Sequence, residues 1–522
     1  MGIYLNPGNN DFRRAVNSKI YVDKTEMLAY TNSILNTEQQ FICISRPRRF
    51  GKSMAANMLT AYYSRGCDSK ELFTPFKIAK ADSFEKHLNQ YNVIYLNIAN
   101  FMQRFKTIEA ALAYICKRIL RELHFEYGDV DCFDWNDLLS TIEDIYAIKK
   151  IPFVFIIDEW DCVFRMKQFT ADDQVAYLNF LRNILKDKSY VVLAYMTGIL
   201  PIKKYGEHSA LNMFSEISMT FAEPYSEYTG FTEAEVYELC QEYHQEMDEI
   251  KKWYDGYCVD GLEMYNPRSV VESLMRGKIQ NYWNATETYK SLQDFIKMNF
   301  DGLREKITGM IAGERFRVNP AKFQNDMTSF QSADDVLTLL IHLGYLTYDS
   351  NTGMAWIPNS EVQQEFINSI EDGGWEEIMN AIRSSDKLIQ ATLDGDTATV
   401  EKLIARSHEE NTSILKYNDE NSLACVISLA YYTARKNYIM HRELPTGKGF
   451  ADIVYIPRKK VDAPALVIEL KHNQPAGTAI EQIKAKNYPE KIAEYTGEII
   501  LVGISYDDEK GHSCEIERVR KY

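Results

Sequence analysis

Three consecutive residues, Gly51, Lys52 and Ser53, have the types and order that bind a phosphate chain. They follow the apolar run FICIS, which ends at Ser45, and the basic stretch RPRRF, and they precede a helical stretch, SMAANMLTAYYS. In a loop of the type G-x-x-x-x-G-K-[ST], backbone N–H groups hold the phosphates, the lysine reaches the β and γ oxygens, and the hydroxyl ligates Mg²⁺. Ser45 stands where such a loop has its first glycine. A basic surface loop is the alternative interpretation.

Two acids about 105 residues downstream favour nucleotide binding. The run FVFIID ends in Asp158, and Glu159 follows directly. The first acid would order the shell of Mg²⁺ and the second would polarise an attacking water, as in ATPases. Thr197 ends a further apolar run and either senses the γ-phosphate or only caps its strand. Arg48 and Arg49 would add positive charge beside the phosphates, so we expect ATP and Mg²⁺ as cofactors.

A second set of candidate residues lies near the carboxyl terminus. Asp452 stands on one apolar run, and Glu469 and Lys471 stand on the next. Because side chains alternate along a strand, Glu469 and Lys471 share a face, and Asp452 joins them if the neighbouring strand aligns. Two carboxylates would then hold Mg²⁺ or Mn²⁺, and the lysine would orient or deprotonate water and stabilise charge on a scissile phosphate. A salt bridge without catalytic function is the alternative.

Further polar residues flank this pair of runs. Glu420, at the start of the preceding helical stretch, is a candidate additional metal ligand. Gln482, Lys484 and Lys486 lie on the helical stretch that follows, and they suit contact with a phosphate backbone. A plain helix cap or a surface position remains the alternative for Glu420 and Gln482.

The elements that must position these residues indicate an α/β protein of three domains. Apolar runs alternate with helical patterns over residues 1–220, which predicts a parallel sheet. Residues 221–405 are mainly helical and contain a helix–strand–turn–strand–helix pattern, which is either a winged-helix-like module or a plain hairpin between helices. Residues 406–522 return to mixed α/β. The four runs expected as strands of the first sheet are residues 41–45, 93–101, 153–158 and 191–197.

Composition excludes several classes of protein. With 45% hydrophobic and 12% aromatic residues the chain is globular, and its net charge of -15 argues against a surface that coats nucleic acid throughout. Residues 411–522 carry 16 basic and 15 acidic side chains, so this part is the better candidate to meet a polyanion. The nine cysteines form no C-x-x-C pair, and neither a signal peptide nor an apolar run of membrane-spanning length occurs. We therefore expect a cytoplasmic protein with reduced thiols and no membrane contact.

Several longer motifs resemble those of the bacterial AAA-ATPase-like family. They are RPRRFGKS, YVDKT (21–25), IIDEWD, WYDGY (253–257), YNPRSV (265–270), GYLTYD and PNSEV (358–362). The resemblance implies a P-loop NTPase domain, a helical region and a carboxyl-terminal PD-(D/E)XK domain of the restriction-endonuclease-like fold. Loss of the first phosphate-loop glycine is typical of the family. Ala451 replaces the proline of the PD-(D/E)XK name without removing a ligand, and WYDGY is either a packed turn or a site.

Two functions from different classes follow. In the first, ATP binding and hydrolysis control a metal-dependent nuclease that acts on nucleic acid, DNA more than RNA. In the second, ATP switches a binding or signalling protein whose nuclease-like domain is catalytically silent. A motor on DNA is less favoured, since no further helicase motifs occur. A homo-oligomer or a protein partner stays open, with Arg48, Arg49 and Arg268 as candidates for an arginine finger.

Overall fold

The computed structural model describes residues 2–202, 211–221, 223–283, 288–298, 300, 302–325, 327, 330–371, 373–411, 420–446, 449–459, 461–485, 492, 497–507 and 509–520. Its contacts divide the chain into two compact units. The first comprises Met1–Ala285 and Arg317–Val362, and the second comprises Thr286–Phe316 and Gln363–Tyr522. The three-domain boundaries at residues 220 and 405 stay a prediction. Among the described helices, none has the length and apolar content needed to cross a membrane.

A five-stranded parallel sheet forms the centre of the first unit; the sequence predicts a parallel sheet and four of these strands, but not β5. Its strands are β1 (Phe41–Ser45), β2 (Asn92–Asn97), β3 (Phe153–Asp158), β4 (Val191–Gly198) and β5 (Ser215–Ile217), in the order β2-β3-β4-β1-β5. The apolar run 93–101 proves shorter as a strand than expected. The Asn97 side chain accepts a hydrogen bond from Asn100 N and thereby starts a helix, which ends β2.

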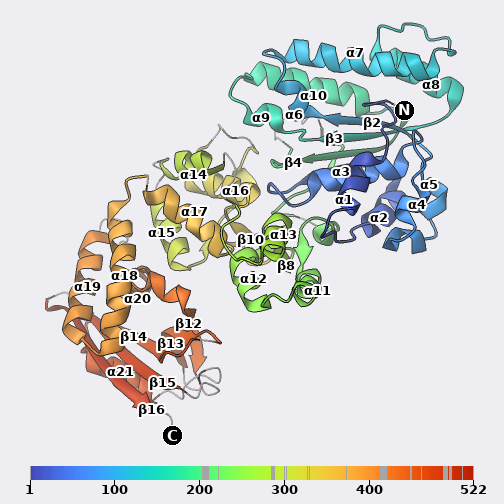
Figure 1. Ribbon diagram of the computed structural model, residues 1–522. Coiled ribbons are helices and arrows are strands. Elements are labelled where there is room, and N and C mark those ends of the chain that lie inside the picture. Colours follow the sequence, from blue (N-terminus) through green and yellow to red (C-terminus); the bar gives the residue numbers. More distant parts are fainter. Residues whose placement is uncertain are drawn as a thin grey trace. The chain divides into compact units, whose positions relative to one another are not determined.

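Helices cover both faces of this sheet. Helices α7, α8 and α10 lie over one face, and α1 and α3 lie over the other (Figure 1). Thr170 and Asp173 form a capping box at the start of α10, and the side chains of Thr107 and Asp137 cap α7 and α8. The helices of this region are α1 (Asn10–Val16), α2 (Glu26–Ile34), α3 (Lys52–Tyr63), α4 (Lys70–Phe73), η1 (Lys77–Lys80), α5 (Phe84–His87), α6 (Ile98–Met102), α7 (Ile108–Tyr127), α8 (Leu138–Lys149), α9 (Cys162–Arg165) and α10 (Ala171–Leu185).

The remainder of the first unit combines helices with two small sheets. One sheet has the order β6-β8-β7 and the other β10-β11-β9. The expected helix–strand–turn–strand–helix order occurs as α16, β10, β11 and α17, and its identity as a winged helix stays a prediction. The elements are η2 (Ser226–Tyr228), β6 (Phe231–Thr232), α11 (Glu233–Tyr243), α12 (Met247–Tyr254), β7 (Tyr257–Val259), β8 (Leu262–Tyr265), α13 (Pro267–Arg276), η3 (Pro320–Lys322), α16 (Ala333–Leu343), β10 (Thr347–Asp349) and β11 (Met354–Trp356). Two further elements, β9 (Phe316–Arg317) and α17 (Ser360–Glu371), contain the points where the chain passes between the two units.

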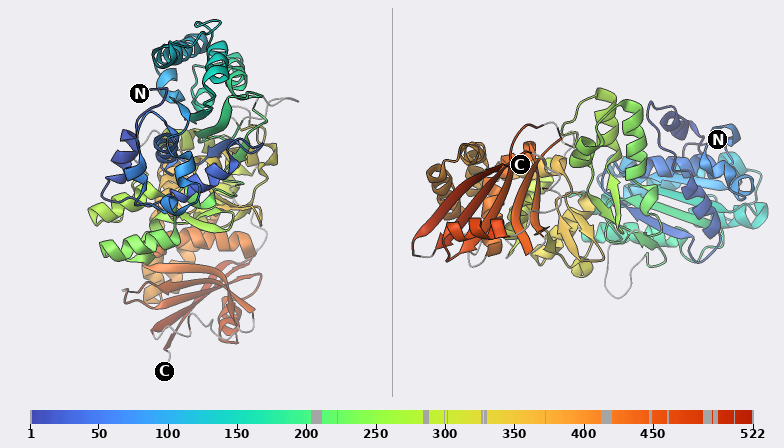
Figure 2. Two further views of the ribbon diagram at one scale, coloured as in Figure 1. Left: turned by 90° about the vertical axis from the view of Figure 1, so that its right-hand side faces the viewer. Right: turned by 90° about the horizontal axis from the view of Figure 1, so that it is seen from below.

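The second unit contains a mixed five-stranded sheet, which matches the mixed α/β fold expected at the carboxyl terminus. Its order is β12-β13-β14-β15-β16, with β14 and β15 parallel and the other neighbours antiparallel (Figure 2). The elements are α14 (Thr288–Ile296), α15 (Leu303–Ala312), α18 (Glu376–Asp394), α19 (Thr397–Asn411), α20 (Glu420–Ala430), η4 (Tyr432–Lys436), β12 (Tyr438–Thr446), β13 (Gly449–Pro457), β14 (Ala465–His472), α21 (Ala476–Ala485), β15 (Glu498–Asp507) and β16 (Gly511–Arg520).

Two hydrophobic cores lie on opposite faces of this mixed sheet. On one face, Ile453, Leu466 and Ile468 join apolar residues of α18, α19 and α20. On the other, Val454 and Val467 join residues of α21. Alternate side chains of β13 and β14 therefore enter alternate cores.

Candidate functional site

The loop from Arg46 to Gly51 connects β1 directly to α3, as a phosphate loop does. Gly51 has a φ of 85°, a left-handed conformation that favours glycine. Lys52 is the first residue of α3 and is 5% exposed, and its Nζ donates to the carbonyl oxygens of Arg46 and Pro47, both at 2.9 Å. Burial lowers the pKa of Lys52, while the nearby acids at the end of β3 oppose this shift. The lysine thus lies buried against its own loop and close to negative charge.

Asp158 ends β3 as a fully buried carboxylate. Its Oδ2 accepts from Asn97 Nδ2 at 3.1 Å, and its Oδ1 accepts from the backbone N–H of Glu159 at 3.1 Å. Burial raises the pKa of Asp158, whereas a hydrogen bond from the Ser53 side chain lowers it. The hydroxyl of the Gly-Lys-Ser sequence and the strand-end carboxylate therefore meet, which supplies two neighbouring oxygen ligands of the kind Mg²⁺ prefers.

Thr197 lies between the phosphate loop and Asp158. Strand β4 separates β1 from β3, and Thr197 is in register with Ile44 on one side and Asp158 on the other. Its side chain is fully buried, and its Oγ1 has no hydrogen-bond partner among the described residues. A buried hydroxyl without a partner is costly, so one at this place suits an acceptor supplied by a ligand.

Arg165 forms an ion pair with Glu159, the second of the two acids at the end of β3. Glu159 has a φ of 55° and forms an ion pair with Arg165, whose Nε also donates to Asp161 Oδ2 at 2.9 Å. Asp161 is fully buried and accepts the backbone N–H groups of Ile199 and Leu200, at 3.1 and 2.9 Å. Sequence reasoning missed Arg165 and Asp161, although the last acid of IIDEWD was visible.

The arginines of the loop differ in their surroundings. Arg46 is 1% exposed, its Nε donates to Thr229 Oγ1 at 3.0 Å, and burial lowers its pKa to about 10. Arg49 donates from NH1 to the carbonyl of Tyr282 at 2.6 Å, and Arg48 is half-buried. Sequence reasoning missed Arg46. Farther along the chain, the 59% exposed Arg268 side chain pairs with Glu272 at 2.8 Å.

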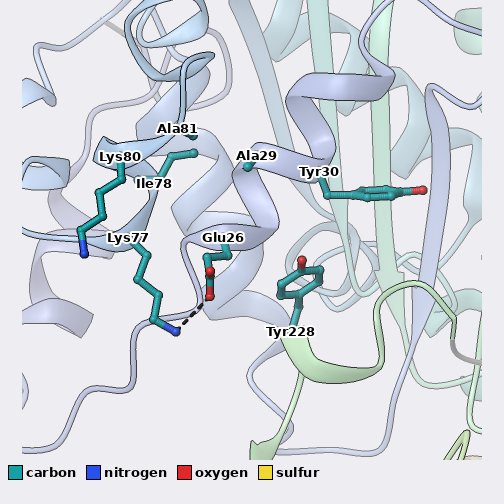
Figure 3. Close-up of a pocket in the computed structure, with 8 residues that line it drawn as sticks. All are labelled: Glu26, Ala29, Tyr30, Lys77, Ile78, Lys80, Ala81 and Tyr228. Carbon is teal, nitrogen blue, oxygen red and sulfur yellow. Dashed lines mark hydrogen bonds and ion pairs between the residues drawn. The ribbon is translucent and has the colours of Figure 1, made fainter.

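A cleft of about 530 Å³ opens between α2, η1 and η2 (Figure 3). Residues of the YVDKT motif (21–25) form hydrogen bonds with the segments that line this cleft. Asp23 and Thr25 accept the backbone N–H groups of Lys77 and Ile78, at 2.9 and 3.1 Å, while Lys24 Nζ donates to the carbonyl of Glu227 at 2.7 Å. None of the site residues expected from the sequence lines this cleft. Its lining residues are Glu26, Ala29, Tyr30, Lys77, Ile78, Lys80, Ala81 and Tyr228.

The candidate residues of the second unit lie on one face of its sheet. Glu469 and Lys471 alternate with Leu470, which enters the core beneath α18 to α20, so they point to the α21 face. The β13–β14 register places Asp452 opposite Glu469, and Asp452 Oδ2 accepts the backbone N–H of Leu470 at 2.6 Å. Lys471 Nζ lies 3.4 Å from Glu469 Oε1. The structure therefore brings together the two acids and the lysine expected from the sequence.

The supporting residues are only partly described. The Glu420 side chain and all of Lys486 lie outside the described residues. Gln482 and Lys484 are on α21 as expected, and Lys484 Nζ pairs with Glu517 at 2.6 Å. No group of three or more His, Cys, Asp or Glu that could hold a metal occurs among the described side chains. A metal at this site would rest on the two carboxylates of Asp452 and Glu469.

Two family models match parts of the chain. Residues 8–206 match the family described as predicted AAA-ATPase, and residues 418–516 match the PD-(D/E)XK nuclease superfamily. The chain joins an AAA-ATPase-like domain to a PD-(D/E)XK domain. The AAA-ATPase match contains the phosphate loop, Asp158 and Thr197, and the PD-(D/E)XK match contains Asp452, Glu469 and Lys471.

One curated relative is similar over most of both chains. It is an uncharacterized protein in the vnfD 5′ region of Azotobacter chroococcum mcd 1, 23% identical over 93% of this chain and 92% of its own length. Among solved structures, a Walker-type ATPase of Pyrococcus abyssi is 11% identical with a TM-score of 0.36, and covers 66% of this chain and 94% of its own. The ORC2 protein of Aeropyrum pernix is 12% identical with a TM-score of 0.32, over 69% and 98%.

Proposed function

We propose that the AAA-ATPase-like domain binds and hydrolyses ATP with Mg²⁺, and that its nucleotide state controls a metal-dependent nuclease in the PD-(D/E)XK domain. One observation carries the first half: β1, β3 and β4 bring Lys52, Asp158 and Thr197 to one edge of a parallel sheet. Ligands of open α/β sheets bind at the carboxyl ends of the strands, which is this edge.

Each residue of this edge has a role that its surroundings support. Lys52 would leave the loop carbonyls and neutralise the β and γ oxygens, while Gly51 lets the backbone N–H groups face the phosphates. Ser53 and Asp158 would hold Mg²⁺, which when bound offsets charge on the phosphates. Thr197 would donate its unpartnered hydroxyl to the γ-phosphate, and Arg48 would add positive charge.

Glu159 would orient and polarise the attacking water. Its carboxylate forms an ion pair with Arg165, which fixes its direction. The same arginine is held by the buried Asp161, so the three side chains form one network. Water attack on the γ-phosphate would then release ADP and phosphate, with the proton of the water passing to Glu159 or to the phosphate itself.

The nuclease half rests on the shared face of Asp452, Glu469 and Lys471. The two carboxylates would hold Mg²⁺ or Mn²⁺, and Lys471 would orient water and stabilise charge on a scissile phosphate. Gln482, Lys484 and Lys486 would contact the nucleic acid backbone, with DNA proposed ahead of RNA, and Glu420 would be an additional ligand. The proposed setting is the cytoplasm, with a homo-oligomer or a protein partner.

A second candidate function is an ATP-switched binding or signalling protein whose nuclease-like domain is silent. The burial of the catalytic candidates favours it: Glu469 is 1% exposed and Lys471 is 8% exposed. A phosphodiester must reach these groups to be cut, and only Asp452 of the three is half-buried.

Cleavage of a mixed panel separates the two functions. Plasmid DNA, linear single-stranded DNA and RNA are incubated with Mn²⁺, with and without ATP, using wild type, Lys471→Ala and Lys52→Ala. Cleavage by wild type but not by Lys471→Ala supports the nuclease, and loss of the ATP effect in Lys52→Ala supports control by nucleotide. If all three proteins leave every substrate intact while wild type hydrolyses ATP, the silent-domain function takes its place.

A further inference from the structure

Two side chains of the phosphate loop, Pro47 and Phe50, pack against residues that follow the parallel sheet in the sequence of the first unit. The Phe50 ring packs edge-on against Tyr257 with centroids 5.0 Å apart, and its carbonyl accepts the backbone N–H of Gly230 at 3.0 Å. Pro47 packs against Gly344 so closely that a Cβ there would lie 2.7 Å from Pro47 Cβ. Pro47 and Phe50, which a phosphate loop does not require for phosphate binding, therefore pack against other parts of the unit.

Arg49 forms the polar part of this contact. It has a φ of 72°, a strained conformation for a residue with a side chain, and its guanidinium donates to the Tyr282 carbonyl at 2.6 Å. A strained residue persists only where its surroundings hold it. The hydrogen bond to Tyr282 holds the Arg49 side chain, and the carboxylates of Glu361 and Glu272 attract its charge.

A single buried carboxylate fixes the turn that offers this carbonyl. Glu361 Oε1 accepts the backbone N–H groups of Tyr282 and Trp283, at 2.6 and 2.9 Å, and its Oε2 accepts Ser269 Oγ at 2.8 Å. Glu361 is fully buried. Without it, the Tyr282 N–H would lose this acceptor, at a cost of about 1–3 kcal/mol, whereas the Trp283 N–H would keep the Asn281 Oδ1 at 2.9 Å. The Glu361 side chain therefore accepts from both residues of the turn that presents the Tyr282 carbonyl to Arg49.

We propose that Glu361 is a positioning residue for nucleotide binding, because it holds the 281–283 turn whose Tyr282 carbonyl anchors Arg49 and thereby the phosphate loop. The inference rests on the proposed function, since it assigns the YNPRSV and PNSEV motifs to the same triphosphate site. Glu361 acts on the loop through the Tyr282 carbonyl and through the attraction between its carboxylate and the Arg49 guanidinium. Nucleotide binding and the order of the turn are then coupled in both directions.

A double-mutant cycle tests this chain of contacts. Equilibrium binding of a non-hydrolysable ATP analogue is measured for wild type, Arg49→Ala, Glu361→Ala and the double variant. Each single change should weaken binding about tenfold, the loss of one charged hydrogen bond, and the double variant should be no weaker than the weaker single variant. Two independent, additive losses, or wild-type affinity in either single variant, would overturn the proposal.

Two controls separate positioning from general stability. Glu361→Gln should bind nearly as wild type, because the amide oxygen still accepts both N–H groups and the Ser269 hydroxyl can turn to accept from the amide. Lys52→Ala should abolish binding. If wild type binds no ATP analogue, the proposed function itself is wrong. If wild type binds the analogue and Arg49→Ala and Glu361→Ala bind it equally well, only the role of Glu361 is wrong.

Amide hydrogen exchange tests the coupling without Glu361→Ala, in case that variant does not fold. The analogue should slow exchange of the Tyr282 and Trp283 amides in wild type about tenfold, and Arg49→Ala should lose most of this protection. A structural role alone would give the same exchange with and without nucleotide. Unchanged exchange in nucleotide-saturated wild type would therefore contradict the coupling.

Discussion

Asp158 and Thr197 lie opposite each other at the carboxyl ends of the neighbouring strands β3 and β4. Asp158 is a buried carboxylate with partners, whereas Thr197 is a buried hydroxyl that has none within the described part of the chain. The pair shares the edge of the sheet that bears the phosphate loop. A buried hydroxyl without a hydrogen-bond partner lowers the stability of the folded protein. Such destabilising groups are typical of ligand-binding sites, where the ligand supplies the missing partner.

Replacing Thr197 by valine should therefore move stability and activity in opposite directions. Valine keeps the shape and removes the unpartnered hydroxyl, so the unfolding free energy should rise by about 1 kcal/mol. The ATPase kcat should fall about tenfold or more, because a hydrogen bond to the γ-phosphate is lost. Thr197→Ser should retain kcat. A valine variant with wild-type kcat would leave Thr197 as a strand-end residue only.

Replacing the two acids at the end of β3, Asp158 and Glu159, should affect ATP hydrolysis in different ways. Glu159→Gln should still bind ATP and Mg²⁺ but hydrolyse ATP about 100-fold more slowly, since the water loses its polarising carboxylate. Asp158→Asn should instead raise the Mg²⁺ concentration needed for half-maximal rate. Rates are measured by phosphate release across a Mg²⁺ titration. Identical Mg²⁺ dependence in both variants would contradict this division of roles.

Asp452→Asn and Lys471→Ala should abolish Mn²⁺-dependent cleavage and leave the ATPase rate unchanged. Each change removes one polar group from the α21 face, and the AAA-ATPase-like site lies in the other unit. Asp462→Asn, an exposed acid between β13 and β14, is the matched control and should cut as wild type. Equal cleavage by Lys471→Ala and wild type would remove this lysine from the proposed mechanism.

The buried Glu361 predicts a pH dependence of stability. Burial raises its pKa to about 7, although Ser269 and two backbone N–H groups oppose the shift. The folded protein then holds this proton more tightly than the unfolded chain, so the stabilisation is complete below about pH 4.5 and is lost as pH rises through 7. Relative to Glu361→Gln, wild type should lose about 3 kcal/mol of unfolding free energy between pH 4.5 and 8.

Urea unfolding of the two proteins at several pH values measures this difference. Trp283, whose N–H bonds to Glu361, is a suitable fluorescence reporter for the surrounding fold. Asp255, whose pKa burial also raises to about 7, titrates in both proteins and cancels in the comparison. Parallel stability curves for wild type and Glu361→Gln would show that Glu361 titrates as an ordinary carboxyl group.

Two glycines of the WYDGY region offer a test of backbone packing. Gly256 and Gly261 both have left-handed backbones, with φ of 93° and 82°. A Cβ on Gly256 would overlap the carbonyl oxygen of Pro358, whereas a Cβ on Gly261 would meet nothing within 4 Å. Gly261→Ala should cost about 1 kcal/mol and Gly256→Ala at least about 2 kcal/mol more. Equal urea midpoints would contradict the close contact between WYDGY and PNSEV.

Sequence patterns predicted the sheet of the first unit and the grouping of the second site for simple reasons. Apolar runs bounded by polar residues mark buried parallel strands, and alternation alone places Glu469 and Lys471 on one face. The end of β2 was misplaced because the run 93–101 stays apolar while Asn97 already caps the next helix. An apolar pattern reports burial, and burial continues across a change from strand to helix.

The network behind the phosphate loop could not be predicted, since each of its links joins distant segments. Arg49 was expected to add positive charge beside the phosphates, yet its partner Tyr282 lies 233 residues away. Arg46 was not singled out, and its partner Thr229 lies 183 residues away. Glu361 has the sequence position of an ordinary acid in the first turn of a helix. No local pattern distinguishes a solvated acid from one that is buried beneath three donors.

The distance in sequence between the loop and its anchors has a consequence for synthesis. At about 5–20 residues per second, a ribosome adds the 233 residues that separate Arg49 from Tyr282 in roughly 10–50 seconds. Throughout that interval the nascent chain contains the Gly-Lys-Ser sequence without Tyr282, whose carbonyl accepts the hydrogen bond from Arg49. Competence to bind nucleotide should therefore begin late in translation, after residue 361 has emerged, so that unfinished chains do not take up ATP.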